Sequence, residues 1–347
     1  MSSQAPPEGN QRLIGEIRQA IERAGGRIPF RDYMELALYH PNYGYYSAPG
    51  EKTGKRGDYL TSPQLSPLFG QCLARFVGSG PVLELGAGDG SLAAQLAPEF
   101  DYTIVERSPD FRSRQQALLS PLPLLSPSAQ DRARGPVRWL DQVPDTFQGT
   151  IISNELLDAL PVHRLVRDQE RYVRADFTEE LGAYSTPRLA EYFDRLGLQP
   201  AGEAEVNLDA VKLMSMVYAR LGKGRVLTID YGYQAEALFM GHPQGTFLTY
   251  HQHTANDNPY EHIGHKDMTA HVDFTTLMAL GESHGLRTTA FTTQADFLAQ
   301  HGIGELLVAL QREASDAAAY TLARQAAITI LDPRGLGAFR VLVQEKG

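Results

Sequence analysis

The chain is organised around one segment, Pro81-Val82-Leu83-Glu84-Leu85-Gly86-Ala87-Gly88-Asp89-Gly90-Ser91-Leu92. Val82–Leu85 is a short, mostly apolar run, which predicts a strand buried in a parallel sheet. Three glycines follow at alternate positions, and Leu92 and Leu96 begin a helical pattern. Glycine tolerates positive φ and lets a ligand approach the backbone, while the N–H groups at a helix start favour electronegative atoms. The segment predicts a cradle for a nucleotide-type ligand, although an ordinary tight turn can have the same glycine spacing.

A second segment, Tyr102-Thr103-Ile104-Val105-Glu106, strengthens the ligand-binding interpretation. It predicts a strand that ends in a carboxylate, twenty positions after Gly86. An acidic residue at this distance is placed to accept hydrogen bonds from two ribose hydroxyls. We therefore expect Glu106, Gly86, Gly88 and Gly90 to bind the cofactor.

The glycine spacing separates two classes of enzyme that share this arrangement, dinucleotide enzymes and S-adenosylmethionine (SAM) methyltransferases. The dinucleotide fingerprint places its third glycine three positions after the second, beside a pyrophosphate. Here Ser91 occupies that position, and Gly90 comes two positions after Gly88. SAM has no pyrophosphate, and its methionine end needs room beside the loop. The string from Glu84 to Gly90 therefore favours S-adenosyl-L-methionine as the cofactor, with Glu84 among the residues expected to bind it.

The composition bounds the class of protein. With 347 residues the chain can form one large domain or two modest ones. A formal charge of −9 argues against a nucleic-acid binder, which would need a basic stripe. The single cysteine, Cys72, excludes internal disulfides and cysteine-based zinc clusters, and its apolar neighbours predict an inert core residue. We expect no membrane span, because no apolar run approaches ~20 residues, and a cytoplasmic location, because the polar first ten residues show no secretory signal.

The segment before the glycine-rich strand predicts a helical N-terminal subdomain over residues 1–60, with the SAM-binding domain over 61–347. Apolar residues recur at helical spacing in both Leu13–Ala24 and Tyr33–Leu38. Ser62, with proline next to it, predicts the start of one apolar helix that continues to residue 76.

Two polar residues, Asp58 and Thr61, lie immediately before this helix. One interpretation makes them turn and capping residues. The other makes them contacts to the amino-acid end of the cofactor, because they stand at the entrance of the core domain. We include both among the candidate cofactor-binding residues.

Val137–Asp141 predicts a third strand, whose end faces the same crevice in a doubly wound sheet. Asp141 is thus placed to accept a hydrogen bond from an adenine amino group. A helix or turn cap is the alternative role for this residue.

The fourth strand, within Thr150–Ser153, is followed at once by Asn154, Glu155 and Asp158. In the methyltransferase arrangement this strand ends beside the methyl donor. Polar groups here can hold a substrate nitrogen or oxygen against the sulfonium methyl, and Asn154 can also contact the cofactor. Helix capping by Asn154 and a local ion pair of Asp158 are the alternatives.

The rest of the chain predicts an insertion and three closing strands. Leu165–Phe177 predicts a hairpin, and Thr178–Asn207 is polar and irregular, so we interpret residues 165–207 as a candidate lid. The further strands are expected at Arg225–Gly232, Arg287–Thr293 and Phe339–Glu345. The expected fold is α/β, a class I methyltransferase (Rossmann-like) seven-stranded sheet with a helical N-terminal subdomain and an insertion after strand 4.

Five histidines lie close together in sequence, at positions His251, His253, His262, His265 and His271. Their spacing matches no compact ligand set such as His-Glu-x-x-His, and the segment is too loop-like to place them on one face. We therefore expect no metal and predict hydrogen-bonded loop histidines, some of them near the substrate.

The chain resembles the MidA-like family of class I SAM-dependent methyltransferases along nearly its whole length. The motifs that carry the resemblance are Tyr33–Pro41 with Tyr43–Tyr46, Gly57–Pro63, the glycine loop, Asn154–His163, Asp230–Tyr233 and Thr269–Phe274. The sequence departs from the family pattern with Leu156-Leu157, where aromatic residues are usual, and at Tyr250–His253. Both departures lie where the protein would contact and recognise a substrate.

The resemblance implies methylation of an arginine in a protein, such as a subunit of respiratory complex I. A guanidinium nucleophile needs a carboxylate that holds it through paired hydrogen bonds and localises its charge. We expect Glu155 to take this role, with Asp158 or His271 assisting and accepting the proton.

Two other functions stay open at this point. One is an assembly chaperone for a respiratory complex with a vestigial methyl-transfer site, and the other is a small-molecule methyltransferase. The sequence fixes neither the acceptor nor the oligomeric state, for which a homodimer is one option.

Overall fold

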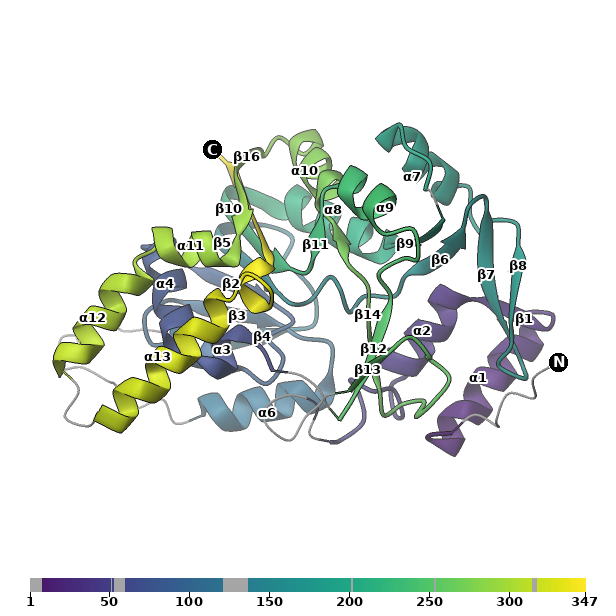
Figure 1. Cartoon of the computed structure of the whole chain (residues 1–347), viewed down its shortest axis with the longest axis horizontal. Coiled ribbons are helices and arrows are strands. Elements are labelled where there is room, and N and C mark those ends of the chain that lie inside the picture. The colour runs from purple at the N-terminus through teal and green to yellow at the C-terminus, as the bar shows by residue number, and fades with distance from the viewer. Residues whose placement is uncertain are drawn as a thin grey trace. The chain divides into compact units, whose positions relative to one another are not determined.

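The computed structural model describes residues 8–50, 52, 60–120, 137–200, 202–252, 254–313 and 317–347 (Figure 1). By its internal contacts the chain divides into two compact units. Unit 1 comprises Met1–Tyr59, Leu157–Met214 and Gly232–Leu277, and unit 2 comprises Leu60–Leu156, Ser215–Tyr231 and Met278–Gly347. This division differs from the expected one, because residues 1–59 group with two later segments instead of standing alone.

Unit 2 is built on a seven-stranded sheet with the strand order β16-β17-β10-β5-β2-β3-β4. Strands β4, β3, β2, β5 and β10 are parallel, and β17 runs antiparallel to both β10 and β16. Their bounds are β2 Val82–Leu85, β3 Tyr102–Val105, β4 Arg138–Leu140, β5 Phe147–Asn154, β10 Leu221–Asp230, β16 Arg287–Thr293 and β17 Arg340–Lys346. All four residues of β2 are buried, as the apolar run predicted.

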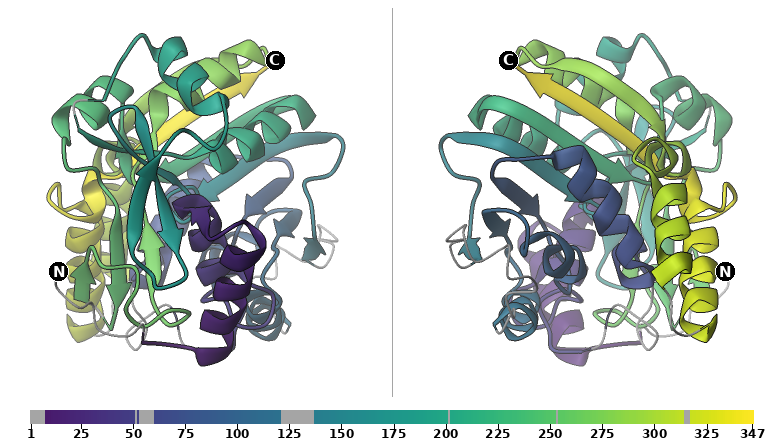
Figure 2. Two further views of the ribbon diagram at one scale, coloured as in Figure 1. Left: turned by 90° about the vertical axis from the view of Figure 1, so that its right-hand side faces the viewer. Right: turned by 90° about the vertical axis from the view of Figure 1, so that its left-hand side faces the viewer.

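Helices of unit 2 pack on this sheet and form its hydrophobic core. Their bounds are α3 Ser62–Leu65, α4 Pro67–Val77, α5 Ser91–Leu96, α6 Pro109–Leu119, α11 Gln294–Gln300, α12 Ile303–Glu313, α13 Ala317–Leu331 and the 3-10 turn Leu336–Ala338. In Figure 2 α12 and α13 lie side by side, in agreement with their contacts. Two of the boundaries between the units fall within helices, namely α8 Leu208–Arg220 and α10 Phe274–Ser283.

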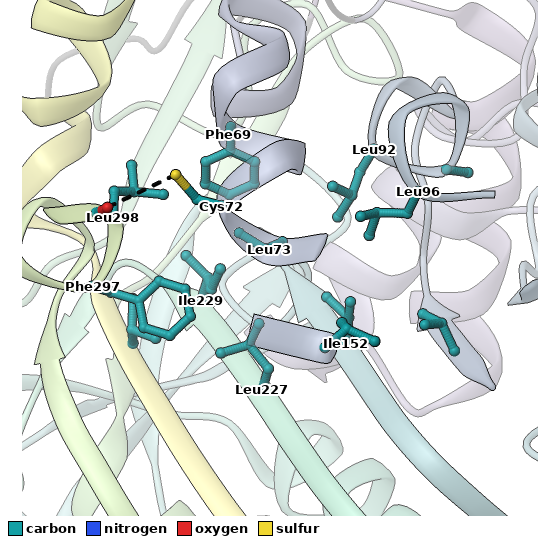
Figure 3. Packing of buried hydrophobic residues seen from close by; sticks show 14 of the residues in the cluster. Phe69, Cys72, Leu73, Leu92, Leu96, Ile152, Leu227, Ile229, Phe297 and Leu298 are labelled. Carbon is teal, nitrogen blue, oxygen red and sulfur yellow. Dashed lines mark hydrogen bonds between the residues drawn. The ribbon is translucent and has the colours of Figure 1, made fainter. Parts of the chain in front are cut away.

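The core of unit 2 joins α4 to the sheet and to α11. Figure 3 shows Phe69, Cys72 and Leu73 of α4 together with Ile152, Leu227, Ile229, Phe297 and Leu298. Each fully buried leucine, isoleucine or phenylalanine side chain contributes roughly 1.5–3 kcal/mol. Cys72 is wholly buried, its Sγ lies 3.8 Å from the Leu298 carbonyl oxygen, and burial raises the pKa of its thiol to about 11. This agrees with the prediction of an inert core residue.

The single helix expected from Ser62 to Phe76 is wrong, because the chain breaks at Ser66. Ser66 has an extended backbone, with φ −148° and ψ 128°. It precedes Pro67, and a residue before proline is disfavoured in the helical region. Thr61, not Ser62, is the N-cap of α3, and its N–H donates to Gln64 Oε1 at 3.1 Å. The Ser66 hydroxyl then accepts from the Leu68 N–H and starts α4.

Unit 1 contains two helices from the N-terminal segment and an antiparallel sheet. The sheet has the order β1-β7-β6-β9, with β8 also paired to β7. The elements are α1 Gln11–Arg23, β1 Arg27–Pro29, α2 Phe30–Tyr39, β6 His163–Val166, β7 Gln169–Arg174, β8 Glu179–Gly182, α7 Arg188–Leu196, β9 Glu203–Val206 and α9 Ala235–Gly241. Smaller sheets pair β11 Gly232–Tyr233 with β15 Val272–Asp273, and β12 Leu248–His251 with β13 Thr254–Asn256 and β14 Asp267–Thr269.

The expectation of an irregular chain over Thr178–Asn207 is wrong, since this segment holds β8, α7 and β9. Helix α7 buries Leu189, Tyr192 and Phe193, which have the spacing of one helix face. Strand β8 is poor in apolar residues, and its Glu179 carboxylate is held by Arg164 and Arg171 at 3.3 and 2.6 Å. Because β8 is held by ion pairs, its sequence has no alternation of apolar and polar residues from which a strand could be predicted. No helix in the described ranges is long and apolar enough to cross a bilayer.

Candidate functional site

Parallel pairing brings four chain segments to one edge of the sheet in unit 2. Leu85 is in register with both Val105 and Ser153, and Ile229 is in register with Asn154. The residues that follow these strands therefore share the carboxyl edge, where ligands bind in open α/β sheets. They are Gly86 after β2, Glu106 after β3, Glu155 after β5 and, as the last residue of β10, Asp230.

The glycine loop has the backbone that only glycine adopts readily. Gly86, Gly88 and Gly90 have φ values of 62°, 54° and 88°. A Cβ added at Gly86 would lie 2.6 Å from Leu156 Cδ1, so a side chain there would require Leu156 to move. A Cβ at Gly88 would meet no atom of the described residues within 4 Å. The loop thus packs closely at Gly86 and borders open space at Gly88, as a cradle for a ligand requires.

Glu106 is a buried carboxylate fixed by local hydrogen bonds. Its Oε1 accepts from the Ser108 N–H at 2.8 Å, and its Oε2 accepts from Gln115 Nε2 at 3.0 Å. Burial raises the pKa of Glu106, and its hydrogen bonds and Arg112 oppose this shift. A carboxylate has about four acceptor positions, so hydroxyl donors of a ribose can still be accommodated.

Glu84 is a buried residue of strand β2, which leads into the glycine loop. Tyr102 Oη donates to its carboxyl group at 2.8 Å. Burial raises the pKa of Glu84 to about 8, and the negative charges of Glu106 and Asp89 add to this effect. A largely protonated carboxyl group at this position supports the packing of β2 against β3, and its contact with cofactor remains a prediction.

Asp141 follows β4 and is largely exposed. Its Oδ1 lies 2.9 Å from Arg112 Nη2. The structure thus gives Asp141 an ion pair, and the predicted bond to an adenine amino group would have to coexist with it.

Thr61 caps helix α3 in the structure, as the capping alternative predicted. Asp58 lies outside the described residues. Contact of either residue with the cofactor remains a prediction.

Glu155 has the most unusual environment of the expected catalytic residues. Its φ is 50°, a left-handed value that is strained for a residue other than glycine and is often found at functional sites. Its backbone N–H donates to the Ile229 carbonyl oxygen at 2.9 Å, which holds the strained residue beside β10. Asn154 Nδ2 donates to Glu155 Oε1 at 3.1 Å.

Burial raises the pKa of Glu155 to about 8, with hydrogen bonds from Asn154 and the Ser62 N–H opposing the shift and the charge of Asp230 adding to it. Asp230 is wholly buried at the end of β10 and accepts from the backbone N–H groups of Leu156 and Tyr231. Sequence reasoning missed Asp230 as a site residue, although its position at the end of the fifth strand was visible. The site therefore holds two carboxyl groups on neighbouring parallel strands.

Asp158 and His271 belong to unit 1, whereas Glu155 belongs to unit 2. Within unit 1 the Asp158 carbonyl oxygen accepts from the Ala270 N–H at 3.0 Å, so the two segments are adjacent. The His271 ring lies 5.5 Å from the Tyr233 ring and 6.0 Å from the His242 ring, measured between centroids. Burial, aided by His242, lowers the pKa of His271 to about 4. A neutral imidazole of such low basicity is a poor proton acceptor, which weakens the role expected for His271.

The histidine-rich segment contains hydrogen-bonded and stacked rings. The His251 Nδ1 lies 2.8 Å from the His265 carbonyl oxygen, and the rings of His251 and His262 stack at 4.3 Å. His253 is outside the described residues. Among the residues that the structure describes, no group of three histidine, cysteine or acidic side chains could hold a metal ion.

The unit 2 residues fit an adenosyl cofactor on three structural grounds. Open space borders Gly88, a buried carboxylate stands at Glu106, and Asn154 Oδ1 is buried with no hydrogen-bond partner among the described residues. An acceptor oriented by the Asn154–Glu155 bond suits an amino group of the cofactor or substrate. Sequence reasoning also missed Gln115, whose three partners are Gly88 in the glycine loop, Glu106 after β3 and Trp139 in β4.

Comparison with known proteins tests these expectations. Residues 71–292 match a family described as S-adenosyl-L-methionine-dependent methyltransferases. A protein from Burkholderia thailandensis, whose crystal structure contains S-adenosyl-homocysteine, is 33% identical with a TM-score of 0.86, over 97% of this chain and 92% of that one. The protein arginine methyltransferase NDUFAF7 homolog, mitochondrial, from Drosophila melanogaster is 28% identical over 82% of this chain and 73% of its own. Protein arginine methyltransferase NDUFAF7, mitochondrial, from Xenopus tropicalis is 27% identical over 85% and 77%.

One expectation is contradicted by these relatives. A cytoplasmic location was expected from the polar N-terminal residues, but the relatives from Drosophila and Xenopus are named as mitochondrial proteins. The composition of the first residues could not distinguish between compartments.

The other comparisons agree with the sequence-based expectations. The likeness to the Burkholderia structure confirms the α/β methyltransferase fold, and its bound S-adenosyl-homocysteine is the product form of the expected cofactor. The family match covers well over half of the chain and includes the glycine loop, Glu106 and Glu155. The chain therefore belongs to the MidA-like family of S-adenosyl-L-methionine-dependent methyltransferases.

Proposed function

We propose that this methyltransferase transfers the methyl group of SAM to an arginine side chain of a protein. This proposal rests mainly on Glu155, which has a strained backbone, is partly buried, and lies with Asp230 at the ends of two parallel strands. The names of the relatives, protein arginine methyltransferases, support the choice of acceptor.

The cofactor supplies a sulfonium-bound methyl group that is already a strong electrophile. The chain then has to bind and orient. We propose that Gly86, Gly88, Gly90, Glu84, Glu106 and Asn154 hold the cofactor, together with Thr61, Asp58 and Asp141 at its two ends. Orientation of two reactants alone can supply about 7–11 kcal/mol.

Glu155 is proposed to accept hydrogen bonds from the substrate guanidinium and to localise its charge away from the attacking nitrogen. That nitrogen gains the methyl group and loses one proton, while the sulfonium becomes a neutral thioether. The raised pKa of Glu155, about 8, suits a group that can receive this proton near neutral pH. Asp158 remains a proposed helper from unit 1.

Labelled SAM tests the class of acceptor directly. The protein is incubated with methyl-tritiated SAM and an extract of its source cells, and protein is separated from metabolites on a gel. We expect label in a protein band, with Glu155→Gln reducing it about 10²-fold or more. Glu99→Gln, an exposed glutamate of the same unit, is the matched control and should keep full transfer. Label only in metabolites would contradict the protein acceptor, and specific binding of a protein without any transfer would indicate a chaperone.

The proposed acceptor is a subunit of a respiratory complex such as complex I, following the family resemblance. We also propose that the inserted segment around residues 165–207 contacts this macromolecular substrate, and that the enzyme forms a homodimer. Mass spectrometry of the labelled band identifies the acceptor. Sedimentation of the purified protein at micromolar concentration tests the dimer, and a monomeric mass would contradict it.

A further inference from the structure

One buried amide in unit 2 connects three parts of the cofactor edge. Gln115 lies in α6 and is wholly buried. Its Nε2 donates to the Gly88 carbonyl oxygen at 2.8 Å and to Glu106 Oε2 at 3.0 Å. Its Oε1 accepts from Trp139 Nε1 at 3.0 Å. A single side chain thus joins the glycine loop, the carboxylate after β3 and the side chain of β4.

The chemistry of the three partners fixes the orientation of this amide. The Gly88 carbonyl and the Glu106 carboxylate can only accept, and the Trp139 indole N–H can only donate. A glutamine supplies two donors and an acceptor on one planar group. Glutamate lacks the donors when it is ionised, and methionine has a similar length without the amide.

The contact with Glu106 determines how this carboxylate meets a ligand. Ser108 donates to one carboxylate oxygen and Gln115 to the other, so each oxygen of Glu106 is held by a hydrogen bond. Gly90 lies close to Gln115, since a Cβ there would make a tight contact of 3.3 Å with Gln115 Cγ. The third glycine of the loop therefore packs against the side chain that links the loop to Glu106.

We infer that Gln115 is a positioning residue for the cofactor, which holds the Glu106 carboxylate and the Gly88 loop in the geometry that binds the adenosyl group. Gln115 acts through these groups and takes no part in methyl transfer. Trp139 is coupled to the same network through the third hydrogen bond. The inference rests on SAM binding and is independent of the arginine acceptor, because it is tested with S-adenosyl-homocysteine alone.

Paired substitutions separate cofactor positioning from general packing. Gln115→Met removes the amide and keeps the length of the side chain. Gln344→Met is the matched control, because Gln344 is also wholly buried and hydrogen-bonded in unit 2, in register with Val226 in the middle of β10. By calorimetry we expect Gln115→Met to raise the Kd for S-adenosyl-homocysteine about ten- to a hundredfold, as for a lost bond to a charged group. Gln344→Met should leave this Kd unchanged. A folded Gln115→Met protein with the wild-type Kd would overturn the inference.

The Gln115→Glu variant allows a second measurement, the pH dependence of the Kd, which would not change if Gln115 had a purely structural role. Gln115 donates to Glu106, which interacts electrostatically with Arg112 and Glu84, and Asp89 in turn interacts with Glu84. An ionised glutamate at 115 would repel Glu106, while a protonated one can donate one hydrogen bond. We therefore expect the Kd of this variant, relative to wild type, to improve as pH falls from about 8 to about 6. A pH-independent ratio would contradict a role exerted through Glu106.

If both variants fail to fold, a measurement on the wild-type protein tests the inference about Gln115. Trp139 is the single tryptophan of the chain, so one indole N–H resonance reports on the Gln115 network. We expect this resonance to shift when S-adenosyl-homocysteine saturates the protein. An indole resonance that stays in place at saturation would show that the network does not sense the cofactor, and would overturn the inference.

Discussion

At the scale of single residues, the site is defined by carboxyl groups whose environments differ. At Glu106 hydrogen bonds from Ser108 and Gln115 oppose the effect of burial on the pKa, whereas burial raises the pKa of two residues, Glu84 and Glu155, to about 8. Burial favours the neutral form of a carboxyl group, so these two residues change charge near pH 8 instead of near pH 4.5. Both the reaction and the stability should therefore depend on pH in this range.

Glu155 should impose a rising pH profile on methyl transfer. Only the ionised carboxylate can hold a guanidinium cation, and its pKa in the unliganded enzyme is about 8. We expect kcat/KM to fall about tenfold for each pH unit below 8, and to level off above it. Initial rates with labelled SAM between pH 6 and 9 measure this profile. A profile that is flat over this range would exclude Glu155 as the titrating group.

Glu84 should make the folded state less stable as pH rises. Its pKa is about 8 when folded and 4.5 in the reference state, so its favourable contribution is complete below pH 4.5 and is lost as pH rises towards 8. Glu84→Gln cannot ionise and keeps an acceptor for the Tyr102 hydroxyl. Urea unfolding from pH 5 to 9 should show a smaller loss of stability for Glu84→Gln than for wild type. Parallel curves for the two proteins would disprove this assignment.

At the scale of elements, the glycine loop has to adopt positive φ values and to leave room for the ligand. A glycine-to-alanine substitution can separate these two requirements. Gly88 and Gly78 both have left-handed φ values, 54° and 67°, and a Cβ at either would meet no described atom within 4 Å. Gly78 ends α4, whereas Gly88 borders the proposed cofactor. The two glycines are therefore matched in their positive φ and in the open space around them, but not in function.

Alanine at either position should lower the unfolding free energy, by about 1 kcal/mol or more, because an L-residue rarely adopts a positive φ. Only Gly88→Ala should weaken binding of S-adenosyl-homocysteine, because its methyl group occupies the ligand side of the loop. Thermal unfolding and calorimetry on both variants give the comparison. Equal affinity in the two variants would place the cofactor elsewhere.

The elements also show what could be predicted from the sequence. Strands β2 and β3 lie where Val82–Leu85 and Tyr102–Val105 predicted them, because a strand buried on both faces is apolar at nearly every position. The break at Ser66 was missed because the apolar stripe continues across it. Strand β8 was missed because ion pairs with Arg164 and Arg171 hold it. Gln115 could not be found because its partners, at positions 88, 106 and 139, meet only in the fold.

At the scale of the whole molecule, the described residues proposed to bind the cofactor all belong to unit 2. Asp158 and His271 belong to unit 1. The low pKa of His271, about 4, means that it is neutral at pH 7 in the protein. A neutral polar replacement should therefore leave the charge of unit 1 unchanged.

Asp158→Asn and His271→Asn should both bind S-adenosyl-homocysteine with nearly the wild-type affinity, because neither residue is among those proposed to hold the cofactor. Any loss in these variants should appear in methyl transfer instead. Calorimetry followed by labelled-SAM assays separates the two effects. A Kd raised tenfold or more in either variant would show that unit 1 takes part in cofactor binding.

The central claim is that Glu155 directs the methyl group of SAM to an arginine of a protein. The most direct measurement is amino-acid analysis of the labelled acceptor after incubation with wild type and with Glu155→Gln, at equal occupancy by the cofactor. We predict that wild type yields labelled methylarginine, and that Glu155→Gln yields about 10²-fold less or none while it still binds S-adenosyl-homocysteine. Label on another amino acid, or undiminished methylarginine from Glu155→Gln, would contradict this account.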